Sequence, residues 1–501
     1  MADRTVVIAG AGPTGLMLAG ELALTGVDVA IVERRTDSGL TGRRAGGLHA
    51  RTIEIFDQRG IAERFIAQGQ KAQATGFAGV RFDIGGMPTR HPYTLGLWQT
   101  HTERLLGDWI AELGVKVQRG VEVTGFTQDP SGVDVALSDG RTLRADYLVG
   151  CDGGRSLVRK LAGIDFPGAD ATTSNLIAEV EMSETPEFGV HRTALGVHSF
   201  GRSDYKVVEG RIVYADHGPI GVMVTERQPG ATAEPTLEDL RAALIDACGT
   251  DYGLQSASWI SRFTDAARQA ATYRKGRVLI AGDAAHIHPP DGGQGLQTGV
   301  QDAVNLGWKL ARVVRGISPE NLLDSYQAER HPVAARVLRN TMVLVMLRRD
   351  DERARALRET IVELLEMEEP RRRFAAEMSE LAIHYDLGGS HPLAGRRMPD
   401  LDIVTKDGPQ RVYALLHHAQ PVLLNFGEPG SLGIDGREGR VQLVDATFTG
   451  AWELPDEGTV PAPGAVLVRP DGYVAWVGDQ SAAGLTDALA TWFGPPAPPA
   501  E

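Results

Sequence analysis

The amino-terminal segment contains the pattern that most restricts the fold of this chain. A β-rich run at residues 5–9 precedes Gly-Ala-Gly-Pro-Thr-Gly at 10–15, and apolar residues at helical spacing follow. A second apolar run at 27–32 ends in an acid, Glu33. Strand, glycine turn, helix, strand and acid in this order are typical of the βαβ unit that binds dinucleotides. We therefore predict an α/β fold with a Rossmann-like parallel sheet.

The glycine turn and the acid each suit a part of a dinucleotide. Gly10 permits the tight turn, Gly12 lets a pyrophosphate approach the backbone amides, and Gly15 allows close contact between helix and sheet. Glu33 can accept hydrogen bonds from ribose hydroxyls, which favours FAD or NAD over a 2′-phosphorylated nucleotide. The motif does not distinguish FAD from NAD.

A second strand-loop-helix segment lies in the middle of the chain. An apolar run at 278–281 breaks at Gly282 and leaves Asp283 at the tip of a predicted strand, where ligands bind in open α/β sheets. Two prolines and a glycine-rich stretch up to Gly295 follow, and helical spacing resumes at Leu296. Amides that lead into a helix N-terminus suit a group that accumulates negative charge. The alternative is an ordinary strand-loop-helix with a glycine-rich turn.

A third predicted strand tip has similar chemistry. The apolar run at 147–150 ends in Cys-Asp-Gly-Gly-Arg-Ser at 151–156, which places the carboxylate of Asp152 near the end of a strand. A coincidence of turn chemistry is the alternative interpretation.

Polar residues between Glu33 and Asp152 are further candidates for cofactor contacts. Gln99 opens a predicted helix in which Thr100 and Glu103 are spaced as a capping box. Arginines that follow a nucleotide motif are well placed to meet phosphate, although solvated surface is the commoner fate of any one of them. These arginines are Arg43, Arg44 and Arg51.

Composition limits the class of protein. A chain of 501 residues exceeds a single core, so two or three domains are expected. The net charge of −14 disfavours nucleic acids and anionic membranes as partners. The sequence shows no apolar run near the length of a bilayer span and no export signal, so the cytoplasm is the expected location. Two unpaired cysteines predict no metal cluster or disulfide framework, so a bound cofactor must supply any redox chemistry.

The remaining chain divides into an insert, a helical region and a carboxyl-terminal module. Short predicted strands, with a helix at 236–248 capped by Thr236 and Asp239, indicate a sheet-rich insert that covers a substrate. Residues 319–385 are predicted to be mainly helical, with a break at 329–332. The predicted boundaries are 1–171 and 269–390 for the nucleotide-binding domain, 172–268 for the insert, 391–494 for the carboxyl-terminal module and 495–501 for a disordered tail.

The carboxyl-terminal module has the element order of a thioredoxin-like fold. Two strands, a hairpin through Pro-Asp-Gly at 470–472 and a final helix are predicted in that order. The module contains no cysteine, so we expect it to serve packing or assembly and not thiol chemistry.

The segments at 10–33, 151–156 and 282–286 resemble, in order and spacing, the three characteristic motifs of single-component FAD-dependent aromatic hydroxylases of the para-hydroxybenzoate hydroxylase fold. The resemblance is strongest to the aromatic-polyketide hydroxylases that act on angucyclines, anthracyclines and anhydrotetracycline, and to the rifampicin monooxygenases. It implies a Rossmann-like FAD-binding domain, an inserted β-sheet substrate domain and a carboxyl-terminal thioredoxin-like domain.

The resemblance also implies roles for individual residues. The glycine turn and Glu33 would hold the ADP half of FAD, Asp283 would contact the ribityl hydroxyls, and the Asp152 segment would serve both pyrophosphate and nicotinamide. The implied cofactor-binding residues are Gly10, Gly12, Pro13, Gly15, Glu33, Arg34, Arg44, Gln99, Asp152, Asp283, Gly293, Gly295, Leu296 and Gln297. The implied catalytic segment, which borders the isoalloxazine ring, is Pro290, Asp291 and Gly292.

Two positions depart from the pattern of the family. Gln297 stands where the family usually has Asn, which leaves the backbone role intact but the side-chain contact open. Asp291 stands where Thr or Ala is commoner, and it can alter substrate preference, act on a proton or face solvent. No catalytic base is assigned, because His286 and His288 suit satisfied packing as well as catalysis.

The implied activity is NAD(P)H-dependent hydroxylation of a bulky polycyclic aromatic polyketide. In the family, NAD(P)H reduces FAD, and O2 adds at flavin C4a to give the hydroperoxide that transfers oxygen. The alternatives are inactivation of a rifamycin-type antibiotic by the same chemistry, or a flavin-containing protein that only sequesters an aromatic compound. The expected partners are a small aromatic molecule and O2, and the expected assembly is a monomer or a homodimer.

Overall fold

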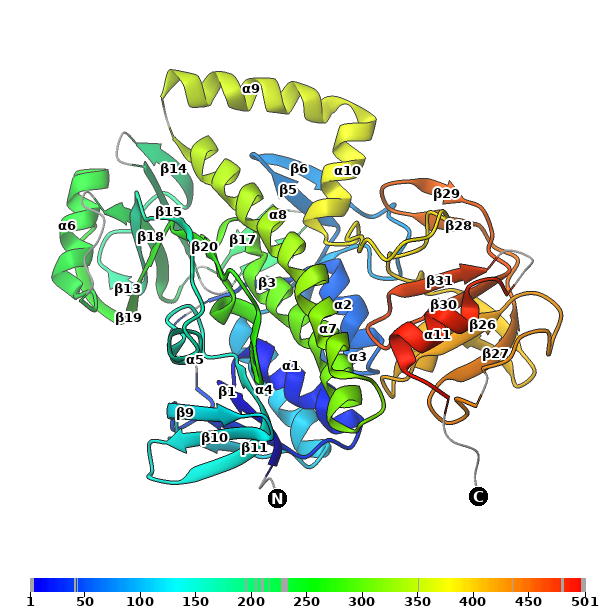
Figure 1. Ribbon diagram of the computed structural model, residues 1–501. Helices are drawn as coiled ribbons and strands as arrows, with labels where there is room; N and C mark the ends of the chain where they lie inside the picture. The colour runs from blue at the N-terminus through cyan, green and yellow to red at the C-terminus, as the bar shows by residue number, and fades with distance from the viewer. Residues whose placement is uncertain are drawn as a thin grey trace.

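The computed structural model describes residues 4–39, 42, 44–193, 196–202, 205–208, 211–215, 217–226, 233–349, 351–434, 436–478 and 482–496. Three main sheets lie in the amino-terminal part, in the insert and in the carboxyl-terminal part, and the long helices α7 and α8 run between them (Figure 1). Arg43 and residues 497–501 of the predicted tail lie outside the described residues.

The amino-terminal sheet has eight strands in the order β21-β22-β11-β1-β2-β8, with β10 and β9 continuing from β11. Strands β8, β2, β1, β11 and β22 pair in parallel, which confirms the predicted Rossmann-like sheet. The strands are β1 (Arg4–Ala9), β2 (Val29–Glu33), β8 (Val117–Arg119), β9 (Val123–Asp129), β10 (Gly132–Leu137), β11 (Thr142–Gly150), β21 (Arg274–Lys275) and β22 (Val278–Ile280).

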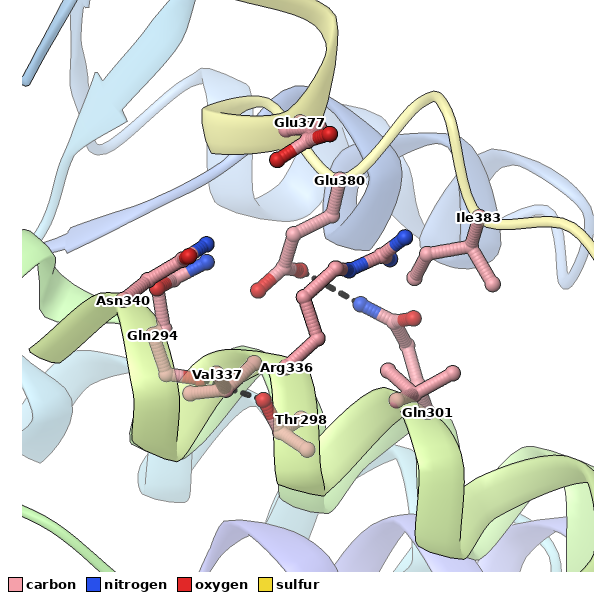
Figure 2. A pocket seen from close by; sticks show the side chains of 10 residues that line it. Gln294, Thr298, Gln301, Arg336, Val337, Asn340, Glu377, Glu380 and Ile383 are labelled. Carbon is pink, nitrogen blue, oxygen red and sulfur yellow. Dashed lines mark hydrogen bonds between the residues drawn. The ribbon is translucent and has the colours of Figure 1, made fainter. Parts of the chain in front are cut away.

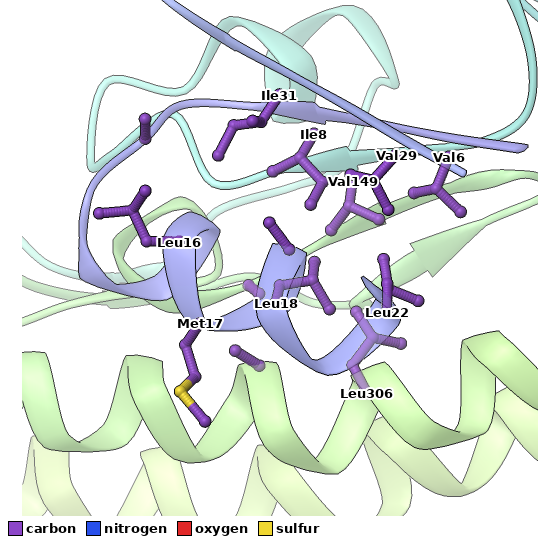
Figure 3. Packing of buried hydrophobic residues seen from close by; sticks show 14 of the residues in the cluster. Val6, Ile8, Leu16, Met17, Leu18, Leu22, Val29, Ile31, Val149 and Leu306 are labelled. Atoms are coloured by element: carbon purple, nitrogen blue, oxygen red, sulfur yellow. The ribbon is translucent and has the colours of Figure 1, made fainter. Parts of the chain in front are cut away.

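Helix α1 (Pro13–Leu24) lies between the parallel strands and α7 (Gly295–Val314), and its apolar side chains fill both contacts (Figure 3). Leu18 and Leu22 are fully buried, and each such side chain stabilises the fold by about 1.5–3 kcal/mol. Helix α4 (Gln99–Glu112) packs so closely on α1 that a methyl group at Gly20 would lie 2.1 Å from the Trp109 ring. Helix α1 is therefore held in place by the sheet and by two helices.

The predicted capping box of α4 is wrong. Trp98 precedes the helix, and no side chain caps its first turn. The Glu103 carboxylate instead accepts hydrogen bonds from the side chains of Arg35 and Gln99. A tertiary ion pair therefore replaces the local cap that the spacing predicted.

Shorter elements complete the amino-terminal part and join it to the insert. They are α2 (Ala50–Asp57), α3 (Ala62–Ile66), α5 (Leu157–Leu161), β3 (Gly47–Leu48), β4 (Gln70–Ala72), β5 (Ala74–Phe77), β6 (Val80–Asp83), β7 (Thr94–Gly96), β12 (Gly168–Ala169), β20 (Ala267–Gln269) and β23 (His286–Ile287). Strands β12, β20 and β23 form a small sheet where the insert leaves and re-enters the amino-terminal part.

The insert is an antiparallel sheet in the order β14-β15-β18-β13-β19, covered by helix α6 (Leu237–Cys248). Thr236 and Asp239 form the predicted capping box at the start of α6. The strands are β13 (Ser174–Met182), β14 (Gly189–Thr193), β15 (Gly196–Arg202), β18 (Ile220–Glu226) and β19 (Leu254–Thr264), with a separate hairpin of β16 (Tyr205–Val208) and β17 (Arg211–Tyr214).

The predicted break at residues 329–332 is wrong, because α8 (Asp324–Arg348) continues through Pro332. The adjacent charges are not loop residues: Arg330 binds Asp302 at 2.7 Å, and Glu329 binds Arg469 at 2.6 Å, both in the interior. Helices α9 (Glu352–Glu366) and α10 (Glu368–Met378) follow. No helix within the described ranges is long and apolar enough to cross a membrane.

The carboxyl-terminal sheet has the order β25-β24-β27-β26-β30-β31 and the helix α11 (Leu485–Phe493). Strand β26 pairs in parallel with β27 and antiparallel with β30, as expected for a thioredoxin-like sheet. The strands are β24 (Asp402–Thr405), β25 (Gly408–Arg411), β26 (Val422–Asn425), β27 (Gln442–Thr447), β28 (Trp452–Leu454), β29 (Gly458–Val460), β30 (Ala465–Val468) and β31 (Val474–Gly478).

Buried charges fasten the carboxyl-terminal sheet to α7 and α8. Arg469 and Asp471, at the β30–β31 turn, are buried against Glu329 and Trp308. Arg51, in the first turn of α2, is fully buried and donates to the Asp471 carbonyl at 3.0 Å. It is therefore part of this interface and not of a phosphate site. Buried hydrogen bonds and ion pairs therefore join the carboxyl-terminal part to α2, α7 and α8.

Candidate functional site

The carboxyl ends of four parallel strands meet at one edge of the amino-terminal sheet. Strands β1, β2, β11 and β22 end beside Gly10, Glu33, Gly150 and Gly282. The strand order changes direction between β1 and β11, which is the switch point where open α/β sheets bind ligands. The N-termini of α1 and α7 open on the same edge. We call this region the crevice.

The three glycines of the turn differ in the room they leave for a side chain: Gly12 has room, whereas Gly10 and Gly15 have none. Gly10 has a φ of 102°, and a methyl group there would lie 2.4 Å from the Cys151 carbonyl oxygen. A methyl group at Gly15 would lie 2.0 Å from the Gly10 carbonyl oxygen, whereas one at Gly12 would meet no atom of the described residues within 4 Å beyond its chain neighbours. Protein packing therefore requires Gly10 and Gly15, but it leaves the space beside Gly12 free for a ligand.

The N-terminus of α1 is suited to an anion. Gly12 occupies the N-cap position without a side-chain cap, and Pro13 begins the helix. The first-turn amides and the positive end of the helix dipole therefore point toward the free space.

Glu33 is an ionised acceptor at the tip of β2. Its carboxylate accepts hydrogen bonds from the amides of Ala11 at 2.8 Å and Arg35 at 2.9 Å. Burial opposes ionisation, but the amides and the Arg35 guanidinium together hold the pKa of Glu33 below its usual value. Arg35 also binds Glu103 at 2.9 Å, whereas the Arg34 side chain is exposed. Sequence reasoning selected Arg34 and missed Arg35, since nothing in the sequence separates two adjacent arginines.

Gln99 attaches the segment around Arg44 to α4. The side-chain oxygen of Gln99 accepts a hydrogen bond from the Ala45 backbone amide at 3.3 Å, and the backbone amide of Gln99 donates to the Ala45 carbonyl at 2.9 Å. Arg44 is exposed next to this connection. Gln99 thus positions a cationic loop, which is compatible with a phosphate contact.

Asp152 follows β11 and has one unused oxygen. Its Oδ2 accepts from the amides of Leu157 and Val158 at 2.7 and 3.1 Å, which caps α5. Its Oδ1 is buried without a hydrogen-bond partner in the described part of the chain. An unpaired carboxylate oxygen at a strand tip requires a partner, and a bound hydroxyl or amide would supply it.

Asp302 fixes the loop that follows β22. This fully buried residue of α7 accepts from the Gly282 amide at 3.1 Å, from His286 at 2.7 Å and from Arg330 at 2.7 Å. Burial raises the pKa of Asp302, but His286 and Arg330 outweigh it and hold the pKa below its usual value. Asp283 is left exposed at the crevice.

The two histidines of this loop are engaged in packing. His286 is buried on Asp302, and Nδ1 of His288 donates to the Pro289 carbonyl at 2.8 Å. Burial lowers the pKa of His288. Neither imidazole is available as a base at the crevice.

The segment from Pro290 to Gln297 turns sharply into α7. Gly292 and Gly293 have φ values of 76° and 64°, and α7 begins at Gly295, followed by Leu296, without a side-chain cap from its N-cap residue Gln294. The Gln297 amide group donates to the Gly47 carbonyl at 2.8 Å and accepts from the His49 amide at 3.3 Å. The departure at Gln297 therefore has a structural role, since it connects α7 to the loop at 47–49.

Asp291 does not face solvent, so that alternative is wrong. Its side chain is nearly buried and binds Arg348 at 2.5 Å. Burial raises the pKa of Asp291, and the Arg348 guanidinium opposes this shift.

A cavity of about 410 Å³ opens beside Asp291 and Gly292. The β5–β6 hairpin, α8 and strand β14 of the insert border it. Four arginines line the cavity, namely Arg81, Arg192, Arg348 and Arg358. The cavity therefore has a strongly positive lining next to the loop that begins α7.

The crevice fits a dinucleotide that carries a polyol and a flat ring. Two uncapped helix N-termini suit the pyrophosphate and the electron-rich ring edge, and Glu33 suits a ribose. The unused Asp152 oxygen and the exposed Asp283 suit further hydroxyl donors. These groups match the chemistry of FAD.

Two family models match the chain. A model described as an FAD binding domain matches residues 3–341, and a model described as the aromatic-ring hydroxylase C-terminal region matches residues 391–496. The first match contains the whole crevice, and the second contains the carboxyl-terminal sheet.

Full-length relatives share this arrangement. A protein of Streptomyces rimosus subsp. rimosus named 12-dehydrotetracycline 5-monooxygenase/anhydrotetracycline 6-monooxygenase is 44% identical, over 98% of this chain and 99% of its own length. A rifampicin monooxygenase of Streptomyces venezuelae is 43% identical, over 98% of each chain. A solved aromatic hydroxylase from angucycline biosynthesis superposes with a TM-score of 0.89 at 40% identity, over 99% of this chain and 100% of the other.

Proposed function

The chain belongs to the family of FAD-dependent aromatic-ring hydroxylases, and from this premise we propose that it hydroxylates a bulky polycyclic aromatic polyketide with NAD(P)H and O2. The observation that carries the proposal is the 410 Å³ cavity, which opens at the loop expected to border the flavin ring. Its size lies within the range of about 300–1,000 Å³ that is usual for small-molecule sites. The insert at 172–268, which contributes Arg192 to the wall, is the proposed substrate domain.

In this proposal the crevice holds FAD along its length. The α1 N-terminus with Gly10, Gly12, Pro13 and Gly15 binds the pyrophosphate, and Glu33 binds the adenosine ribose. The other proposed contacts are Arg34, Arg44, Gln99, Asp152, Asp283, Gly293, Gly295, Leu296 and Gln297. When bound, FAD supplies the electron transfer and oxygen activation that protein side chains cannot supply.

The charge of the cavity indicates the chemical state of the substrate. The cavity lining contains four arginines and one carboxylate, that of Asp291, which pairs with Arg348, so the wall favours ligands with ionised oxygens. Polycyclic phenols and hydroxyquinones carry such oxygens when they lose a proton. An ionised phenol is also the more electron-rich ring, which suits attack by an electrophilic oxygen.

Substituting Asp283 by Ala is expected to weaken FAD binding about 10- to 100-fold, because a hydrogen bond to a charged group contributes about 1.5–3 kcal/mol. The side chain is exposed, so the unfolding temperature of the apoprotein should not change. Flavin fluorescence titration of the apoprotein measures the affinity. Asp386→Ala, which removes another exposed carboxylate, is the control, and a wild-type FAD affinity in Asp283→Ala would refute the assigned contact.

Substituting Asp291 by Ala is expected to raise the share of NAD(P)H that ends as H2O2, at roughly unchanged FAD affinity, since the loop loses its ion pair and admits water. Arg348→Ala should have the same effect, because it removes the other partner. Peroxide release per NAD(P)H consumed measures the effect. Unchanged leakage in both variants would show that the pair does not seal the site.

Product analysis tests the proposal as a whole. The enzyme is incubated with NAD(P)H and a panel of anthracyclines, angucyclines, tetracycline precursors and rifamycins, and products are identified by mass spectrometry. A gain of one oxygen atom on a polycyclic polyketide supports the proposal. Turnover of rifamycins alone would favour antibiotic inactivation, which the similarity to rifampicin monooxygenases supports. NAD(P)H oxidation that no aromatic compound stimulates would indicate a sequestering protein.

A further inference from the structure

A small polar chamber lies behind the first turns of α7. It has a volume of about 10 Å³, which is about the space that one water molecule needs. Side chains from α7, from α8 and from the end of α10 point into it (Figure 2). Its polar lining includes Gln294, Thr298, Gln301, Arg336, Glu377 and Glu380.

Several polar atoms in and beside the chamber are buried without a hydrogen-bond partner in the described part of the chain. They are Oε1 of Gln294, Oε1 of Gln301, Oε1 of Glu380 and Nδ1 of His49. All four residues are at most 7% exposed. Leaving so many polar atoms unpaired is costly, and a bound water would satisfy several of them.

The His49 ring lies beside Glu380, which lines the chamber. Nδ1 of His49 lies 3.8 Å from Oε1 of Glu380, which is too long for a direct hydrogen bond but suits a bridging water. The other oxygen of Glu380 accepts from Gln301 at 2.5 Å. Glu380 follows α10 with a φ of 61°, a left-handed conformation that usually selects Gly, so the chain retains a carboxylate where a glycine would be less strained.

The other edge of the His49 ring is directed toward the crevice. A methyl group built on Gly293 would lie 3.6 Å from Nε2 of His49, and Gly293 belongs to the loop that begins α7. His49 also follows β3, where Gln297 connects its amide to α7. One imidazole therefore has one nitrogen at the crevice and one at the chamber.

We propose that His49 and Glu380 form a buried dyad that carries a proton between the floor of the crevice and the chamber. A hydroxyl group in the crevice loses its proton to Nε2 of His49, and the Glu380 carboxylate stabilises the imidazolium that forms. The proton returns along the same route or leaves from Nδ1 through the chamber water to Glu380. The step moves one proton and no electrons.

The dyad would supply the proton that the monooxygenase reaction consumes, and in this respect the inference rests on the proposed function. Hydroxylation with NAD(P)H and O2 takes up one proton per turnover while the site excludes bulk water. Glu377, in the wall of the chamber, binds Arg373 at 3.5 Å, and the Arg373 side chain is exposed at the surface. The charged groups that face the dyad are Glu377 from α10, Arg336 from α8 and His288 from the loop before α7.

Nitrogen NMR of the 15N-histidine-labelled holoenzyme without an aromatic substrate tests the dyad directly. His49→Asn identifies the resonances of His49 among the 13 histidines. We expect the neutral ring to carry its proton on Nδ1, toward Glu380, and we expect Glu380→Gln to lower the share of the ring that is protonated there, because the carboxylate that favours this tautomer is gone. His384→Asn, at an exposed histidine, should leave the His49 signals unchanged.

The functional arm uses stopped-flow proton uptake with an indicator dye in the complete reaction. Glu380→Gln and His49→Asn should each slow uptake about tenfold, and the double variant should be no slower than either. A proton on Nε2 of the neutral His49 ring in the wild type, or a tautomer ratio that Glu380→Gln does not change, would overturn the proposal. The tautomer in the wild-type protein decides the question even if a variant loses FAD, and neither NMR result depends on which polyketide is the substrate.

Discussion

Replacing Gly12 by Ala is expected to weaken FAD binding about a hundredfold, or roughly 2.8 kcal/mol, while the apoprotein unfolds at the wild-type temperature. A methyl group at Gly12 would meet no atom of the described residues within 4 Å beyond its chain neighbours, so it causes no steric clash in the apoprotein. The methyl group would instead occupy the space in which a pyrophosphate approaches the α1 amides. Flavin fluorescence titration and thermal unfolding of the apoprotein measure the two effects separately.

Two neighbouring experiments sharpen this prediction. Gly107→Ala, in the interior of α4, should leave FAD binding unchanged and should not lower the unfolding temperature, because the methyl group meets no atom of the described residues within 4 Å and Ala favours the helix. Gly15→Ala should lower both, because its methyl group would lie 2.0 Å from the Gly10 carbonyl oxygen. A Gly12→Ala protein that binds FAD as tightly as the wild type would show that the pyrophosphate lies elsewhere.

Replacing Asp302 by Ala is expected to lower the free energy of unfolding by about 3–5 kcal/mol, because it leaves Arg330 and His286 buried without their partner. The same change frees the Gly282 amide and loosens the turn that presents Asp283, so FAD binding should weaken as well. Urea unfolding followed by tryptophan fluorescence measures the loss of stability. Glu359→Ala, at an exposed acid of α9, is the control.

The loss of stability caused by Asp302→Ala is also expected to depend on pH. The pKa of Asp302 is lowered in the folded protein, so its contribution is present above its unfolded pKa and is lost as the pH falls through the folded pKa. The difference in stability between wild type and variant should therefore shrink in acid. A difference that grows as the pH falls would contradict the buried ion-pair network.

The fold was predictable wherever local chemistry and tertiary packing agree. Glycines at 10, 12 and 15 with Glu33 predicted the βαβ unit, because close packing at Gly10 and Gly15 leaves few alternatives. Thr236 and Asp239 predicted a cap that the structure forms. The Pro-Asp-Gly turn at 470–472 predicted the last hairpin for the same reason.

Sequence reasoning failed where charged residues are paired over long distances. Glu329 and Arg330 suggested a break in a helix, but their partners Arg469 and Asp302 lie in other elements and bury them within α8. No local pattern announces such pairs, since each partner alone is typical of an exposed surface.

The candidate site shows the same division. The strand tips that carry Glu33, Asp152 and Asp283 could be placed at one edge because parallel strands end together. The proximity of His49 and Glu380 could not be predicted, because His49 follows a short strand near the amino terminus and Glu380 follows α10. Only the three-dimensional arrangement shows that an unpaired carboxylate lies beside an imidazole at the crevice.

The central claim is that the crevice between α1 and α7 holds FAD. The most direct measurement is the visible spectrum of the purified protein, combined with release and identification of the bound flavin and with titration of added FAD into any apoprotein. A yellow protein that holds one FAD per chain, and that loses it in Gly12→Ala while remaining folded, is the predicted result. A colourless protein that does not take up added FAD would contradict the claim.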